Sequence, residues 1–140
     1  MTLSYVGDLG EILPKYDSNK KKDPDCTLVI KQLHEGDYGF AHNTHNHYEL
    51  MNRIFKHISY DFKDDLKDIV KNRYVRYSSR HVDMESKDDF WILGNGLLVA
   101  ETSMLVFDRK VYDDVHPQSV PMFMRVHIAN LMASTGPEWT

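Results

Sequence analysis

An Asn-Gly pair, Asn95-Gly96, between two apolar runs constrains the fold of this chain more than any other feature. The runs cover residues 90–93 and 97–107. Asn-Gly is favoured in two-residue type I′ turns, because both central residues of such a turn need a positive φ. We therefore predict an antiparallel hairpin whose two-residue loop places Ile92 opposite Val99.

Further strands and helices follow from hydrophobic periodicity. Residues 26–33 are short and β-branched, and residues 73–82 alternate in character, so both are predicted strands. Leu50, Ile54 and Ile58 are four residues apart, which predicts one apolar stripe of a helix. The three predicted helices are residues 45–60, a segment from Asp61 to about residue 70, and residues 120–134, which ends before Gly136.

These elements predict a single α+β domain. It contains an antiparallel sheet of about four strands, with the Asn-Gly hairpin at its centre, packed on one face by two or three helices. Residues 1–25 are broken by glycine and proline and are expected to form an irregular arm, with residues 26–140 as the domain. The predicted core consists of Leu28, Ile30, Leu50, Ile54, Phe55, Ile58, Leu66, Ile69, Leu93, Leu98, Ala100, Met104, Val106, Phe123, Val126 and Leu131.

Composition narrows the class of protein. The net charge of −4 lacks the basic excess of a nonspecific nucleic-acid binder. No apolar run is long enough to cross a membrane. The single cysteine, Cys26, permits no internal disulfide, which favours a reducing, cytoplasmic location. In a predicted strand, we interpret this thiol as a small buried apolar side chain.

Three histidines lie close together, at His42, His45 and His47. Imidazole is a common ligand of zinc and iron, so the trio is a candidate metal site. Gly39 followed by His45-x-His47 resembles the first half of the cupin metal motif, which implies a metal held by these histidines. Glu49 comes too early for the family's carboxylate ligand. The helical period predicted to begin near His47 would spread the three imidazoles around a helix start.

Glu101 and Ser103 interrupt an otherwise apolar strand on one predicted face. A buried carboxylate is costly unless it is paired. Glu101 therefore either faces solvent, pairs with a base such as Arg76 or His81, or lies in a functional cleft.

No complete catalytic motif is present, so two functional interpretations remain. The first is a small non-catalytic accessory protein without a cofactor, of the kind found in phages and mobile elements, which binds another protein or itself as a homo-oligomer. Aromatic residues and methionine are enriched at such interfaces, and the candidate contacts are Tyr74, Tyr77, Trp91, Met122, Met124 and Trp139. The second is a metal-dependent enzyme or binder that uses zinc or iron at His42, His45 and His47. The sequence does not identify the partner.

Overall fold

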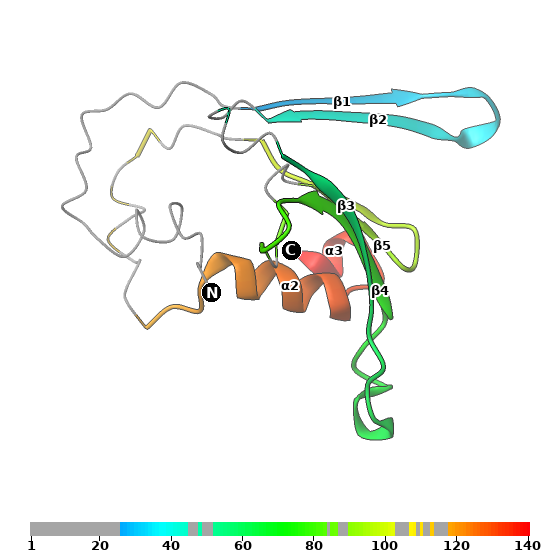
Figure 1. The fold of residues 1–140 in the computed structure, drawn as a ribbon, viewed down its shortest axis with the longest axis vertical. Helices are drawn as coiled ribbons and strands as arrows, with labels where there is room; N and C mark the ends of the chain where they lie inside the picture. The colour runs from blue at the N-terminus through cyan, green and yellow to red at the C-terminus, as the bar shows by residue number, and fades with distance from the viewer. Residues whose placement is uncertain are drawn as a thin grey trace.

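The protein has an α+β fold, as predicted, and its described residues form two antiparallel sheets and two short helices (Figure 1). The computed structural model describes residues 26–44, 48, 52–83, 85–86, 90–102, 107–108, 110, 113 and 118–140. The predicted N-terminal arm, residues 1–25, lies outside the described residues.

The first sheet is a hairpin of β1 (Cys26–Gln32) and β2 (Tyr38–Thr44), joined by the 3-10 turn η1 (His34–Gly36). The predicted strand at residues 26–33 is confirmed, but its place in the main sheet is wrong, because it pairs with β2 alone. Strand β2 was not predicted from the sequence. The amide of Leu33 donates to the carbonyl of Asp37 at 2.7 Å and closes the hairpin.

The second sheet has four strands in the order β3, β4, β5, β6, each antiparallel to its neighbour. Its strands are β3 (Ile54–Ser59), β4 (Tyr74–Ser79), β5 (Phe90–Leu93) and β6 (Leu98–Ala100). The predicted strand at residues 73–82 and the predicted hairpin are therefore both confirmed in position.

The register predicted for the β5–β6 hairpin is wrong by one residue. Its loop has three residues rather than two, because the amide of Leu93 donates to the carbonyl of Leu97 at 2.9 Å. Gly96 alone in this loop has a positive φ, 89°, as in a type I turn that ends in a left-handed residue. Val99 consequently lies opposite Trp91. This shift exchanges the faces of β6, so Leu98 is 38% exposed rather than part of the core.

The predicted helix at residues 45–60 is wrong for Ile54–Ser59, which form β3. Burial alternates along this strand, and Ile54, Lys56 and Ile58 are its less exposed residues. The sequence of β3 does not show this alternation, because a lysine such as Lys56 is normally expected at a solvent-facing position. Its ammonium group instead donates to the backbone carbonyls of Arg80, at 2.6 Å, and Asp83.

The helix predicted after Asp61 is also wrong. Residues 60–73 form a long connection whose regular part is the short 3-10 turn η3 (Asp64–Leu66). The amide of Tyr60 donates to the carbonyl of Arg73 at 2.8 Å and ties the two ends of the connection together. Phe62 and Val70 pack against the core, whereas Ile69 is 48% exposed.

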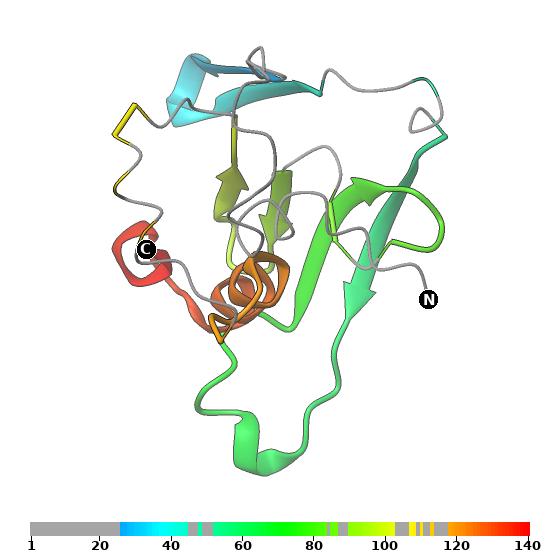
Figure 2. The same cartoon turned by 90° about the vertical axis from the view of Figure 1, so that its left-hand side faces the viewer.

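The core lies between the four-stranded sheet and α2 (Met122–Met132), which confirms the predicted C-terminal helix (Figures 1 and 2). Its buried apolar cluster consists of Val75, Tyr77, Leu93 and Leu131. Leu93 and Leu131 were predicted core residues, and Ile58 packs against the cluster. The core prediction is wrong for the exposed residues Ile30, Phe55, Leu66, Ile69 and Leu98. Predicted core residues Leu50, Met104 and Val106 lie outside the described residues.

A buried amide network fixes the end of α2 to the sheet. The side-chain nitrogen of Asn72, which is fully buried, donates to the carbonyls of Asn130 and Ala133 at 2.9 and 2.8 Å. Its side-chain oxygen accepts from the amide of Asn95 at 2.9 Å. The network therefore joins the β5–β6 turn, the connection before β4 and the helix end. Gly136 begins the short helix α3 (Gly136–Trp139), which Thr135 caps by accepting from the Glu138 amide.

Candidate active site

Cys26, His42 and Thr44 lie on one face of the β1–β2 hairpin. Cys26 is directly opposite Thr44, and Leu28 is opposite His42. Alternate residues of a strand share a face, so His42 and Thr44 point the same way. Cys26 and His42 are thus diagonal neighbours across the two strands. The Cβ atoms of such diagonal pairs are typically about 7–8 Å apart or less. All three residues are partly buried. The hairpin register therefore brings the single thiol beside an imidazole and a hydroxyl group.

The hydrogen bonds of His42 define its tautomer. Its Nε2 atom is 2.7 Å from the backbone carbonyl oxygen of Glu101, which can only accept, so Nε2 carries the hydrogen. The opposite nitrogen, Nδ1, lies 3.5 Å from the hydroxyl oxygen of Thr44. A neutral imidazole with its Nε2 hydrogen fixed has a free lone pair on Nδ1. His42 is therefore oriented as a base toward the face that carries Cys26 and Thr44.

Two phenylalanine rings border the imidazole on its apolar side. The ring of Phe40 is stacked with His42 at a centroid distance of 6.5 Å, and the ring of Phe90 lies 6.3 Å from it. Phe40 and Phe90 are themselves 5.4 Å apart, which joins the hairpin to the four-stranded sheet. Both rings are partly buried. Electrostatic interactions are stronger in such surroundings than in water.

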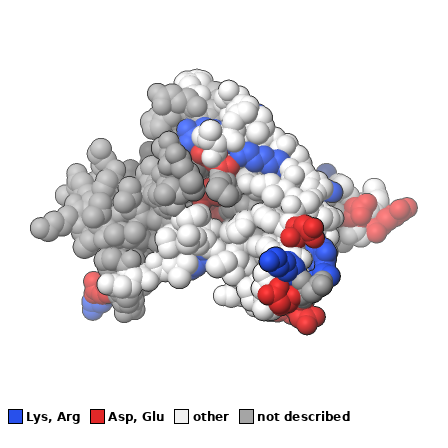
Figure 3. Space-filling view, turned by 60° about the horizontal axis from the view of Figure 1, so that its bottom comes forward, with Lys and Arg blue, Asp and Glu red and all other residues white. Residues whose placement is uncertain are grey.

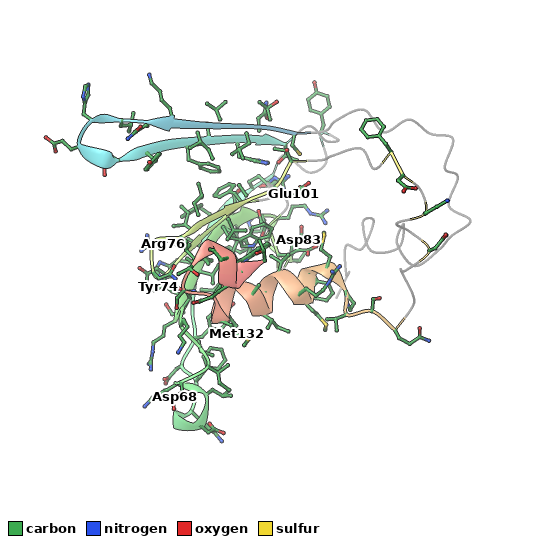
Figure 4. All side chains as sticks on the ribbon, turned by 180° about the vertical axis from the view of Figure 1, so that it is seen from behind. Asp68, Tyr74, Arg76, Asp83, Glu101 and Met132 are labelled. Atoms are coloured by element: carbon green, nitrogen blue, oxygen red, sulfur yellow. The ribbon has the colours of Figure 1, made fainter. Side chains whose placement is uncertain are left out.

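The carboxyl group of Glu101 responds to the same surroundings. Partial desolvation raises its pKa above the ordinary value, and the neighbouring His42 lowers it to a smaller extent. Figure 4 shows Glu101 where the chain leaves the sheet beside the β1–β2 hairpin. Of the interpretations that the sequence left open, the pairing with Arg76 is not formed among the described residues, where the Arg76 guanidinium bonds to His57, stacks on Tyr74 and makes no ion pair.

The structure describes only part of the predicted histidine site. His42 is bonded to Glu101, while His45 and His47 lie outside the described residues. Within the described ranges, no group of three or more His, Cys, Asp or Glu side chains could hold a metal ion. The zinc or iron site at His42, His45 and His47 stays a prediction.

The predicted partner contacts occupy different places in the fold. Met122 and Met124 are exposed on α2. Tyr77 is buried in the core, and burial raises its pKa to about 12. Trp91 packs against the same core, and Trp139 donates its indole hydrogen to the side-chain oxygen of Asn130 at 2.8 Å. Tyr74 lies on the opposite sheet face, against Arg76. A partner for these residues stays a prediction.

Charge on the described surface is mixed in sign. On the face shown in Figure 3, Lys and Arg atoms lie close to Asp and Glu atoms in small groups, and neutral surface separates these groups. At Arg80 the two signs pair directly, since its guanidinium bonds to the Asp83 carboxylate at 2.9 and 3.1 Å. None of the helices in the described part of the chain is long and apolar enough to cross a membrane.

Comparison with known proteins identifies the family. The whole chain, residues 1–140, matches the family described as phospholipase B. It is 35% identical to "Phospholipase B-like 1" of Rattus norvegicus over 99% of its own length and 26% of the relative's. It is 33% identical to "Phospholipase B" of Crotalus adamanteus over 98% of this chain and 27% of that protein. The chain therefore belongs to the phospholipase B family, and it spans about a quarter of the length of these relatives.

This membership corrects the functional interpretation of the sequence. The chain is not a phage-like accessory module, and the preference for a non-catalytic protein is contradicted by a family named for lipid hydrolysis. Short contiguous motifs do not reveal this pair. The thiol and the imidazole are 16 positions apart in sequence, and only the pairing of β1 with the unpredicted strand β2 makes them neighbours. A lone cysteine together with a distant histidine was the available signal.

Proposed function

We propose that this chain contributes the nucleophile and the base of a phospholipid acyl hydrolase, with Cys26 as nucleophile and His42 as base. The observation that carries the proposal is the hydrogen bond of His42 Nε2 to the Glu101 carbonyl, which leaves Nδ1 beside Thr44, the residue directly opposite Cys26. The family supplies the class of substrate, since its members are named phospholipase B.

The first chemical step forms an acyl-enzyme. His42 Nδ1 accepts the thiol hydrogen of Cys26, and the thiolate sulfur attacks the carbonyl carbon of an acyl ester. The bond between that carbon and the alcohol oxygen then breaks. The leaving alcohol takes the proton from His42 Nδ1, so the products are a thioester on Cys26 and a free alcohol.

The second step regenerates the enzyme. Water gives a proton to His42 Nδ1 as its oxygen attacks the thioester carbon, and the carbon–sulfur bond breaks. The thiolate recovers its proton from the imidazole, and a fatty acid is released. The carbonyl of Glu101 keeps the imidazole in one tautomer throughout. Since this partner is a neutral carbonyl, it orients His42 without adding a negative charge.

Thr44 is the second candidate nucleophile, because its hydroxyl oxygen lies 3.5 Å from His42 Nδ1. A thiol is the stronger candidate, since it ionises far more readily than an aliphatic hydroxyl. Both candidates share the same base, so one experiment separates them.

The experiment follows acyl transfer onto the protein. The chain is incubated with a short-chain phosphatidylcholine, quenched, and analysed by mass spectrometry with and without neutral hydroxylamine. We expect an added acyl mass on the peptide of Cys26, removed by hydroxylamine as a thioester is, and absent in Cys26→Ala. Thr27→Val, a change at an exposed neighbour, is the matched control. Fatty acid release unchanged in Cys26→Ala would disprove the assignment, and an oxygen ester on Thr44 would transfer it to that residue.

A further inference from the structure

Arg76 is held in a fixed position on the face of the sheet that faces away from α2. Its Nε hydrogen is donated to Nδ1 of His57 at 3.2 Å, and its guanidinium carbon lies 4.9 Å from the centre of the Tyr74 ring. The rings of His57 and Tyr74 are 5.0 Å apart, so the two partners also support each other. Figure 4 shows Tyr74 and Arg76 side by side. Little side-chain entropy is left in Arg76 to be lost when it binds a ligand.

The terminal nitrogens of this guanidinium have no hydrogen-bond partner among the described residues. Among the described residues, none accepts a hydrogen bond from Nη1 or Nη2 of Arg76, and none forms an ion pair with it. Arg80 differs, because its guanidinium is satisfied by the Asp83 carboxylate. A partly buried guanidinium with an open pair of donors binds a phosphate or carboxylate in two-point geometry. Arg76 therefore presents a fixed pair of open donors, a geometry suited to an anionic group.

The face of the four-stranded sheet that carries Arg76 also carries Phe90, whose ring meets the candidate active site on the β1–β2 hairpin. Arg76 is directly opposite Ile92, and Phe90 is two residues further along β5, a step of roughly 7 Å. The Phe90 ring lies 6.3 Å from the imidazole of His42. The sheet surface between the two sites is apolar, since Ile92 and Leu98 lie opposite each other and share this face.

We propose that Arg76 binds the phosphate of a glycerophospholipid whose acyl ester is attacked at Cys26. The ligand class combines the groups that the two sites and the surface between them can recognise: an anionic phosphodiester for Arg76, an apolar chain for the sheet surface, and an ester carbonyl for the thiol on the hairpin. The attack on the ester at Cys26 rests on the proposed function. The binding of a phosphate at Arg76 does not depend on it. Tyr74 and His57 are positioning residues, since they act through the guanidinium.

The binding test uses the complete 140-residue chain, labelled with ¹⁵N. The backbone amide resonances of residues 75–77, which stay observable when the side chain at position 76 is changed, are followed by NMR during titration with glycerophosphocholine, and separately with inorganic phosphate. We expect a saturable shift with glycerophosphocholine, lost in Arg76→Gln and retained in Arg73→Gln, whose side chain is exposed on the preceding loop. Saturation by inorganic phosphate alone would identify a free-phosphate site and overturn the assignment to a phospholipid. No saturable shift, or an equal one in Arg76→Gln, would also overturn it.

The kinetic test compares two esters that differ in the phosphate. Arg76→Gln is expected to lower kcat/KM for dihexanoyl phosphatidylcholine by about 10- to 100-fold, as for loss of a charge-assisted hydrogen bond. The same variant should hydrolyse 4-nitrophenyl hexanoate, which has no phosphate, at the wild-type rate. An equal loss on both esters would overturn the role in phosphate recognition. If the wild-type chain hydrolyses neither ester but still binds glycerophosphocholine at Arg76, the hydrolase proposal fails and the phosphate site stands.

Discussion

The Nε2 hydrogen of His42 and the carbonyl oxygen of Glu101 form a 2.7 Å hydrogen bond between residues 59 positions apart in sequence. It links the two-stranded hairpin to the end of β6, beside the ring contact of Phe40 with Phe90. A carbonyl acceptor leaves only one tautomer for the neutral imidazole. The contact between the two sheets therefore also determines which nitrogen of His42 can act as a base.

Replacing His42 by glutamine separates orientation from basicity. The glutamine amide can still donate to the Glu101 carbonyl, but it offers no nitrogen lone pair to accept a proton. We expect fatty acid release to fall by about 100- to 10,000-fold, the range for loss of a general base, with an unchanged circular dichroism spectrum. His34→Gln, at an exposed turn position, should keep full activity. Wild-type rates in His42→Gln would show that another group removes the proton.

Substitutions at Thr44 test whether its hydroxyl group only supports His42 or is itself the nucleophile. Thr44→Val removes the hydroxyl that lies 3.5 Å from His42 Nδ1 and keeps the β-branched shape of the strand residue. If Cys26 is the nucleophile, we expect a loss of about tenfold or less, the size of one neutral hydrogen bond. Thr44→Ser should restore the wild-type rate. Complete loss of acyl-enzyme formation in Thr44→Val would favour the hydroxyl instead, and quenched-flow mass spectrometry measures it directly.

The sequence predicted the elements whose signal is local. The Asn-Gly pair located the β5–β6 hairpin, and apolar spacing located α2. The register was not predictable, because the Asn95 side chain is engaged by distant groups. Its nitrogen donates to the carbonyls of Ala133 and Ser134 at 3.1 and 3.2 Å, and its oxygen accepts from the Leu97 amide at 3.1 Å. Tertiary contacts thus selected the three-residue loop over the two-residue turn that Asn-Gly favours.

The candidate site was hidden for a related reason. Cys26 and His42 become neighbours only through the pairing of β1 with β2. The orienting carbonyl belongs to the backbone of Glu101, which side-chain patterns cannot reveal. The strand β3 was predicted as a helix for a different reason. Its Lys56 faces inward, so the sequence of β3 lacks the alternation of apolar and polar residues that predicts a strand. Long-range pairing and backbone acceptors are the features that periodicity does not encode.

The buried amide of Asn72 is expected to be a major source of stability. Asn72→Ala removes the Asn72 partner from the Asn130 carbonyl and the Asn95 amide, while the Ala133 carbonyl keeps its bond from the Asn95 side chain. Each buried group left unsatisfied is costly, so we expect the free energy of unfolding to fall by about 2–4 kcal/mol. Urea unfolding followed by tryptophan fluorescence measures the change, because Trp139 belongs to the same network through Asn130.

A control for the Asn72 experiment is available in the same chain. Asn52 is exposed, and Asn52→Ala should change the free energy of unfolding by no more than about 0.5 kcal/mol. Similar stability of the two variants would mean that the amide network does not hold α2 against the sheet.

Glu101 predicts a pH dependence of stability that is separate from catalysis. Its pKa in the folded protein is raised above the ordinary value of 4.5, chiefly by desolvation. The folded state therefore binds this proton more tightly than the unfolded state, so the group's contribution to stability is present at low pH. That contribution is lost as the pH rises from the ordinary pKa through the raised one. Glu101→Gln should remove this part of the decline in Tm and keep the backbone carbonyl that orients His42.

Thermal unfolding across this pH range tests the prediction, with Glu35→Gln at an exposed turn as the control. An unaltered pH profile in Glu101→Gln would contradict it, and lost hydrolysis at neutral pH would give the carboxyl a role in the reaction.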